Sequence, residues 1–134
     1  MVLICGPRIK PESIKAPPGG EVKGFVPRLY EHLAACDLAV VQGGGSTTLE
    51  LTVLKRPFLY FPLEGHSEQE IAVASRLLRL GAGVKMSFSQ TTEASLAEAA
   101  LKNIGREVSY PSLPIDGASR AADLILPLLQ GAFK

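Results

Sequence analysis

Residues 38–50 of the chain read LAVVQGGGSTTLE, and this stretch decides the fold. The apolar run 38–42 is typical of a buried strand, and the three glycines after it allow a turn whose backbone approaches a neighbour closely. We expect a helix to follow, from about Thr48 to Leu54. Because the first amides of a helix are unpaired and lie at the positive end of its dipole, this turn favours an anion, above all a phosphate. A tight turn that holds no ligand is the alternative interpretation.

The composition limits the class of protein. The 134 residues, 46% of them hydrophobic, are enough for a single domain that spans 1–134 and has its own core. The net charge is +1 and the basic residues are scattered, so the sequence predicts neither nucleic-acid binding nor a basic membrane patch. No apolar run approaches the roughly 20 residues that a membrane helix needs.

The cysteines and histidines indicate no special chemistry. Cys5 and Cys36 lie in apolar segments and form no CxxC motif, which favours two small buried thiols in a reduced, cytoplasmic protein. His32 and His66 share no ligand spacing with these cysteines, so we expect no metal site and no metal cofactor.

Short apolar runs alternate with segments of helical period. We expect strands at residues 2–5, 22–26, 38–42, 58–61 and 84–86. The first of these strands is predicted to be covered on both faces, because all its residues are apolar.

The predicted helices begin after proline, capping or polar residues. They start at Pro27, about Thr48, Glu68, Glu93 and Asp116. The helix 68–80 is expected to bury Ile71, Ala74, Leu77 and Leu78, with Gly81 and Gly83 as its cap. Residues 6–20, rich in proline, are predicted to form a functional or poorly ordered loop, and residues 110–114 an extended linker.

Strands that alternate with helices predict an α/β fold, a Rossmann-like, mostly parallel sheet flanked by helices. Ligands of such sheets bind beyond the carboxyl ends of the strands. Three segments are therefore expected to converge on one site, namely residues 25–26, 43–46 and 63–69.

Three familiar motifs do not fit the glycine turn. Residues 43–48 read GGGSTT, which lacks the GxGxxG spacing of the dinucleotide fingerprint. No lysine follows the glycines before a serine or threonine, so the turn is not a P-loop. Ser46 is not followed two places later by glycine, which excludes a nucleophile elbow.

The segment 36–86 resembles a known family. The residues that carry the resemblance are Ala35, Cys36, Asp37, Gly44, Ser46, Thr47, Leu49, Glu50, Pro57, Pro62, Gln69, Gly81 and Gly83, preceded by residues 24–27, GFVP. In this order and spacing they are similar to the C-terminal, donor-binding domain of GT-B glycosyltransferases, of the MurG-like and UDP-glycosyltransferase types. The chain would then be the C-terminal half of a GT-B fold.

The resemblance implies a role for several residues in binding a UDP-sugar. The diphosphate would be held by Gly44, Gly45, Ser46 and Thr47. Phe25 and Val26 would contact the uracil, Glu50 would accept hydrogen bonds from both ribose hydroxyls, and Glu68 and Gln69 would contact the sugar. Such a site stabilises the leaving diphosphate with fixed donors, so the resemblance implies no metal.

Each role has a structural alternative. Thr47 and Glu50 have the spacing of a capping box, in which the Glu50 carboxylate folds back onto the amide of Thr47. Phe25 has an alternative place in the core, and Gln69 an alternative as a solvated first-turn residue. His66, Glu64 and Glu68 have the residue types of acid–base catalysts, but nothing in the sequence assigns a catalytic residue.

The chain also departs from the family pattern. Gln42 stands where UDP-glycosyltransferases carry a histidine that contacts phosphate, and Glu68 where they usually have an aspartate. The family's domain begins with a strand and a glycine-bearing turn, and the resemblance implies that this chain starts after that strand–helix unit. The acceptor domain is also outside the chain.

Three functions remain open at this point. The first is a domain that binds a UDP-sugar, such as UDP-N-acetylglucosamine, for hexosyl transfer, with an acceptor domain or partner subunit supplied elsewhere. The second is a sugar-nucleotide epimerase of the same architecture. The third is a non-enzymatic interaction module that self-associates through an uncovered sheet edge.

Overall fold

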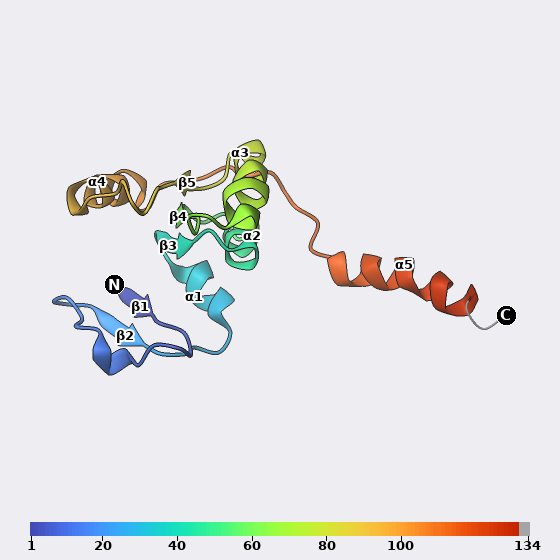
Figure 1. Ribbon diagram of the computed structural model, residues 1–134, viewed down its shortest axis with the longest axis horizontal. Helices are drawn as coiled ribbons and strands as arrows, with labels where there is room; N and C mark the ends of the chain where they lie inside the picture. Colours follow the sequence, from blue (N-terminus) through green and yellow to red (C-terminus); the bar gives the residue numbers. More distant parts are fainter. Residues whose placement is uncertain (132–134) are drawn as a thin grey trace.

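The computed structural model describes residues 1–131, which form two parallel sheets and the helices around them (Figure 1). The larger sheet has the order β3-β4-β5, with β3 at Ala39–Gln42, β4 at Phe58–Phe61 and β5 at Val84–Lys85. Val40 lies opposite Leu59, and Leu59 opposite Val84. The strands and helices alternate along the chain, and the predicted α/β class is confirmed.

The smaller sheet consists of two strands near the N-terminus. β1 (Val2–Ile4) pairs in parallel with β2 (Glu21–Lys23), and the loop between them contains one short 3-10 helix, η1 (Pro11–Ser13). The prediction that β1 is covered on both faces is wrong, because Val2 is 49% exposed and Ile4 37%. Of the described residues, none before Leu33 is buried.

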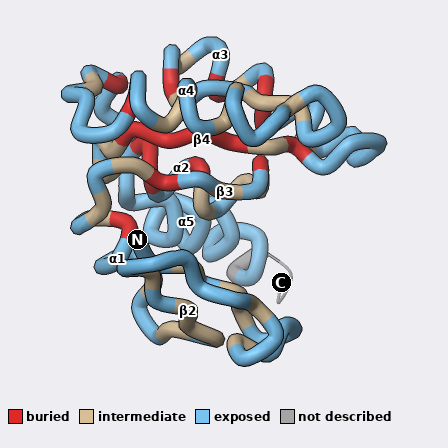
Figure 2. Tube along the Cα trace, turned by 90° about the vertical axis from the view of Figure 1, so that its left-hand side faces the viewer, coloured by how far each residue is buried: buried red, intermediate tan, exposed pale blue. Residues whose placement is uncertain are grey.

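The core lies between the larger sheet and the helices on one of its faces. These helices are α1 (Leu29–Ala35), α2 (Gly45–Val53) and α3 (Ala74–Leu80). They contribute Leu33, Leu51 and Leu77, which cluster with Phe58 and Tyr60 of β4. Figure 2 shows the buried residues gathered along β4 and the helices beside it, whereas the N-terminal sheet is only exposed or half-buried and residues 117–129 of α5 are exposed.

The region after β4 contains an unexpected π-helix. η2 (Glu68–Val73) is a π-helix that continues directly into α3. A π turn holds more residues than an α turn, so it shifts the buried face. Ala74 and Leu77 are buried as predicted, but Ile71 and Leu78 are 66% and 82% exposed, and Val73 is buried instead. Gly81 caps α3 with a φ of 59°.

Two further helices lie C-terminal to the sheet. α4 (Glu93–Asn103) begins at a capping box of Thr92 and Ser95 and packs on β4. α5 (Gly117–Gly131) lies away from the rest of the molecule (Figure 1) and runs through Pro127. The predicted linker between them is anchored at Tyr110, which is buried and whose hydroxyl accepts a hydrogen bond of 3.3 Å from the Gly83 amide.

The cysteines are free, as predicted, but each is only partly buried. Desolvation raises the pKa of the Cys36 thiol, which therefore stays protonated at neutral pH.

Candidate functional site

The glycine turn joins the end of β3 to α2 at the carboxyl edge of the larger sheet. The Gly43 amide donates a hydrogen bond of 2.7 Å to the Phe61 carbonyl, so the turn stays against the end of β4. A Cβ at Gly43 would lie 2.8 Å from the Pro62 Cα, whereas a Cβ at Gly44 would have no neighbour within 4 Å. Gly43 therefore serves the packing of the turn, and Gly44 leaves open space above the helix start.

The first turn of α2 is free to bind an anion. The helix begins at Gly45, three residues earlier than predicted, and its N-cap Gly44 has no side-chain cap. The buried Thr48 hydroxyl donates to the Gly44 carbonyl at 2.8 Å. It therefore stabilises the turn and does not cap the amides at the start of the helix. Within residues 1–131, no protein hydrogen bond is made by the amides of Gly45, Ser46 and Thr47. These are the orphan donors of a helix N-terminus, and they favour a phosphate.

Glu50 does not form the capping box that its spacing allows. Because the N-cap is Gly44, Glu50 lies in the second turn of the helix, where its carboxylate cannot fold back onto the helix start. Glu50 is exposed, and its carboxylate makes no hydrogen bond with the residues that the structure describes. The capping alternative is therefore wrong, and the carboxylate is free for a ligand.

Gln69 is held in a defined orientation. Its Oε1 accepts hydrogen bonds of 2.9 Å from the Leu63 amide and 3.3 Å from Gln42 Nε2. Gln69 thus lies in the first turn of η2, as its structural alternative states, but it is half-buried and its Oε1 has protein partners. The Nε2 donors of Gln69 remain available, and they lie beside the end of β3, next to the glycine turn. The contact with Gln42 was not predicted from the sequence.

Two charged side chains lie beside Gly45. Arg76 of α3 donates from Nη2 to the Gly45 carbonyl at 3.2 Å, and its Nε is buried with no partner among the described residues. A Cβ on Gly45 would lie 3.7 Å from Arg76 Nη2 and 3.7 Å from Glu68 Oε1. Glu68 is thus near the predicted diphosphate site, not only the sugar. Arg76 was not predicted from the sequence, where its only signal is a basic residue on the following helix.

Glu64 connects two loops at the same edge of the sheet. Its Oε1 accepts from the Ser89 hydroxyl at 2.7 Å, the Ser89 amide at 3.0 Å and the Ser87 hydroxyl at 3.2 Å. The hydrogen bonds from the Ser89 hydroxyl and then the Ser89 amide hold the pKa of Glu64 below its usual value. Glu64 is therefore a carboxylate that orders the loops 63–67 and 87–91. These hydrogen bonds do not favour the role of proton donor.

Phe25 and Val26 follow β2 on the smaller sheet. Phe25 is 72% exposed, so its alternative place in the core is wrong. Among the described residues, no hydrogen bond joins Phe25 or Val26 to the glycine turn. The structure thus brings together the predicted phosphate, ribose and sugar residues, but it does not bring the predicted uracil residues to them.

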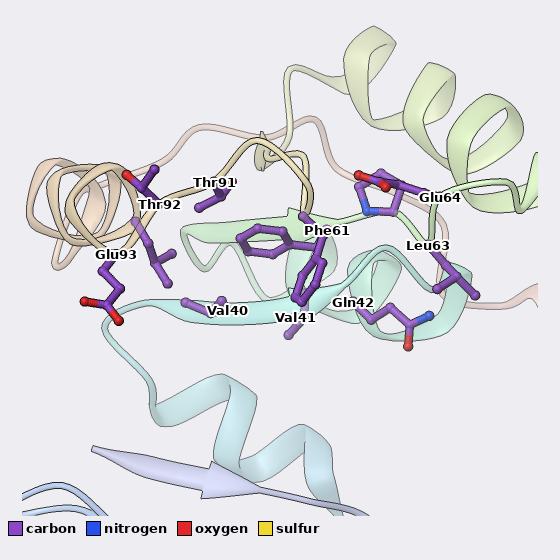
Figure 3. A pocket seen from close by; sticks show the side chains of 12 residues that line it. Val40, Val41, Gln42, Phe61, Leu63, Glu64, Thr91, Thr92 and Glu93 are labelled. Carbon is purple, nitrogen blue, oxygen red and sulfur yellow. The ribbon is translucent and has the colours of Figure 1, made fainter.

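A largely apolar groove of about 780 Å³ runs along the other face of β3. Its floor includes Val40, Gln42 and Phe61, and its far wall is Leu96 of α4, the N-cap Thr92 and the loop residue Phe88. Figure 3 shows Val40 and Gln42 along β3, with Thr92 and Glu93 at one end and Leu63 and Glu64 at the other. The groove reaches the glycine turn only at Gln42.

Neither a metal centre nor a membrane helix is found in the part of the chain that the structure describes. Between residues 1 and 131, no three His, Cys, Asp or Glu side chains lie close enough together to hold a metal ion. In the same range, each helix is too short or too polar to cross a bilayer.

Comparisons with known proteins identify relatives of the chain. The chain is 38% identical over 95 residues to an uncharacterized glycosyltransferase of Methanosarcina mazei, a match that covers 70% of this chain and 25% of that protein. It is 30% identical over 102 residues to an uncharacterized glycosyltransferase of Methanopyrus kandleri, with 75% and 29% covered.

A bacterial enzyme with a described activity is also similar. Over 82 residues the chain is 34% identical to the UDP-N-acetylglucosamine--N-acetylmuramyl-(pentapeptide) pyrophosphoryl-undecaprenol N-acetylglucosamine transferase of Desulforamulus reducens, which covers 58% of this chain and 21% of that enzyme. The chain spans about a quarter of the length of these relatives.

The family itself follows from the largest match. Residues 1–111 match the glycosyltransferase family 28 C-terminal domain. This range includes the glycine turn, Glu50 and Gln69, and the resemblance predicted from the sequence is confirmed. The chain belongs to the glycosyltransferase family 28 C-terminal domain family, the donor-side domain of GT-B glycosyltransferases.

Proposed function

We propose that the chain binds a UDP-sugar and serves as the donor-binding part of a hexosyltransferase. The observation that carries this proposal is the uncapped first turn of α2 with the free Glu50 carboxylate on the same helix. A helix start that no side chain caps offers its amides to a diphosphate, and a free carboxylate one turn further can accept two hydroxyl hydrogen bonds.

The roles of the side chains follow the geometry of the larger sheet. The amides of Gly45, Ser46 and Thr47 hold the diphosphate, and Glu50 binds the ribose. Gln69, whose Oε1 is engaged by Leu63 and Gln42, donates from Nε2 to an oxygen of the sugar. Phe25 and Val26 contact the uracil in this proposal, and their loop has to approach the glycine turn when the nucleotide binds.

The site stabilises the leaving nucleoside diphosphate with preorganised donors, so no metal is part of the proposal. Arg76 adds a positive charge next to Gly45. UDP-N-acetylglucosamine is the candidate donor, because it appears in the name of the relative from Desulforamulus reducens. An acceptor domain or partner subunit has to supply the acceptor. The two free thiols support a reducing compartment such as the cytoplasm.

Calorimetric titration with UDP tests the proposal. We expect binding in the micromolar to millimolar range that the variant Glu50→Ala weakens by about tenfold to a hundredfold, since a hydrogen bond to a charged group contributes roughly 1.5–3 kcal/mol. Glu98→Ala is the matched control, because Glu98 is also an exposed glutamate on a helix, α4, far from the glycine turn in the sequence. Absence of binding at millimolar UDP would exclude the proposal for this chain.

A second titration separates the parts of the nucleotide. Uridine, UMP and UDP should bind with increasing affinity, because each phosphate adds hydrogen bonds at the start of α2. Equal affinities for uridine and UDP would show that the helix start does not hold the diphosphate.

A further inference from the structure

Arg76 lies beside the first peptide group of α2. Its Nη2 donates a hydrogen bond of 3.2 Å to the Gly45 carbonyl, and a Cβ on Gly45 would lie 3.7 Å from the same nitrogen. The Gly45 carbonyl also accepts a hydrogen bond of 3.3 Å from the Thr48 hydroxyl. A carbonyl in the first turn of a helix ordinarily accepts one amide of its own helix. These two further donors therefore fix the orientation of the Gly45 carbonyl.

The orientation of this carbonyl decides the direction of one orphan amide. The Gly45 carbonyl and the Ser46 amide belong to one planar peptide group, and among the described residues no peptide bond is cis. In a trans peptide group the carbonyl and the amide point in opposite directions. The hydrogen bond from Arg76 therefore also fixes the Ser46 N–H, so that it points out of the helix start toward the position proposed for the diphosphate.

The π-helix η2 brings a carboxylate to the same place. Glu68 and Arg76 are eight positions apart in the sequence, and in an uninterrupted α-helix they would lie about 80° apart around the axis. The wider turn of η2 reduces this difference. Glu68 Oε1 lies 3.7 Å from the position of a Gly45 Cβ, as Arg76 Nη2 does, so the two groups are at most twice this distance apart. Such π turns within helices are frequent at functional sites.

The two charges beside Gly45 are not paired with each other. Within residues 1–131, neither Arg76 nor Glu68 takes part in an ion pair. The Nε of Arg76 is buried and has no hydrogen-bond partner in the same range. A buried charged donor without an acceptor costs free energy. An anion beside Gly45 would offset this cost, because water screens the attraction only weakly where the guanidinium is buried. The charge of Arg76 is therefore available to a ligand.

We propose that Arg76 is a positioning residue for the diphosphate of the donor. Its guanidinium orients the Ser46 amide through the Gly45 carbonyl, and its charge offsets that of Glu68, which would otherwise repel the anion. Arginine suits both tasks, because it stays charged at any relevant pH and holds several donors in a fixed plane. The inference rests on the proposed function, since the diphosphate at the start of α2 is itself proposed.

Titration with UDP and with uridine, followed through the amide signals in NMR, tests the inference. UDP has no sugar beyond its ribose, so contacts between Glu68 and a donor sugar do not enter the result. Arg76→Met keeps an apolar stem but removes the charge and the donors. It should weaken UDP binding by about tenfold, the effect of one charge-assisted contact, and should change uridine binding by less than about twofold. Arg79→Met is the matched control, because Arg79 is an exposed arginine of α3, and it should change neither affinity.

A second substitution distinguishes positioning from support of the fold. Glu68→Gln alone should change UDP binding by less than about twofold, because Arg76 already offsets the carboxylate. Combined with Arg76→Met, it should restore UDP binding by about threefold or more relative to Arg76→Met alone, a coupling expected only of interacting residues. Arg76→Lys, which keeps the charge and one set of donors, should bind UDP to within about threefold of the unsubstituted chain. The shift of the Ser46 amide signal on UDP binding should be smaller in Arg76→Met.

Three results would overturn the inference. They are unchanged UDP binding in Arg76→Met, an equal loss of UDP and uridine binding in that variant, and a loss that Glu68→Gln does not restore. The proposed function fails separately, when the unsubstituted chain binds no UDP. UDP binding that Glu50→Ala weakens and Arg76→Met does not would support the proposed function and exclude the role of Arg76.

Discussion

Strands β1 and β4 are both short runs of apolar residues, yet three of the four residues of β4 are buried and none of the three in β1 is. β4 lies between β3 and β5, with α2 and α3 on one face and α4 on the other. β1 has one neighbouring strand, and no residue from 1 to 28 around it is buried. The difference teaches that an apolar strand is buried by the strands and helices that pack around it and not by its own composition.

The comparison predicts that truncating an apolar side chain lowers the free energy of unfolding much more in the core than in β1. Leu51→Ala in α2 should lower the free energy of unfolding by about 2–5 kcal/mol, because the side chain is 0% exposed. Ile4→Ala in β1 should lower it by about 1 kcal/mol or less, because the side chain already contacts water. Urea unfolding followed by circular dichroism measures both. Equal losses would show that β1 is covered in solution.

The glycine turn offers a sharper test inside the well-packed region. Gly43→Ala should lower the free energy of unfolding by about 1–3 kcal/mol, because the added Cβ would lie 2.8 Å from the Pro62 backbone. Gly44→Ala should change the stability by no more than about 0.5 kcal/mol, since the position has open space and a φ of −70°. Thermal unfolding of the two variants checks the prediction. A stable Gly43→Ala protein would mean that the end of β3 is as loosely held as β1.

A smaller effect is expected at the start of α2. Thr48→Val should lower the free energy of unfolding by about 1 kcal/mol, because it removes the buried hydroxyl that donates to the carbonyls of Gly44 and Gly45. Thr47→Val is the control, since the Thr47 hydroxyl makes no hydrogen bond with the described residues. Chemical denaturation measures both. The same loss in both variants would contradict the role of Thr48 in shaping the turn.

The smallest effect is a pH dependence at Glu64. The pKa of Glu64 is lowered in the folded state, so its hydrogen bonds stabilise the folded state at pH values above the ordinary pKa of 4.5. This stabilisation is lost as the pH falls through the lowered pKa. The Ser89 amide signal should therefore shift with acid below about pH 4.5, when followed by NMR. In Glu64→Gln this titration should disappear. A shift that persists in the variant would have to come from another group.

The sequence predicts the larger sheet well, because its signals are local. The apolar runs 39–42 and 58–61 are bounded by glycines and prolines, and each forms a strand within one residue of the prediction. The same bounding glycines and prolines also predict the glycine turn and the helix after it. The start of α2 was placed three residues late, because glycine at 45 is a poor helix former and the threonines resemble a cap.

The remaining errors have non-local causes. Ile71 and Leu78 were assigned to the core by a period of 3.6 residues, which the π-helix η2 breaks. The hydrogen bond between Gln42 and Gln69 joins residues 27 positions apart, and no pattern in the sequence predicts it. Likewise, the exposure of β1 depends on which strands and helices pack around it, and the run of apolar residues does not contain this information.

The anchored Tyr110 limits the space that α5 can reach. Its hydroxyl is held by the Gly83 amide, and its ring packs edge-on against Phe58, with the ring centroids 6.1 Å apart. From this fixed point, the six residues 111–116 span at most about 20 Å when fully extended. Any surface that binds α5 within that radius meets it at an effective concentration on the order of millimolar, as for two sites joined by a short flexible linker. The anchored Tyr110 thus keeps helix α5 within a short distance of the core, so that α5 can bind such a surface as an intramolecular ligand.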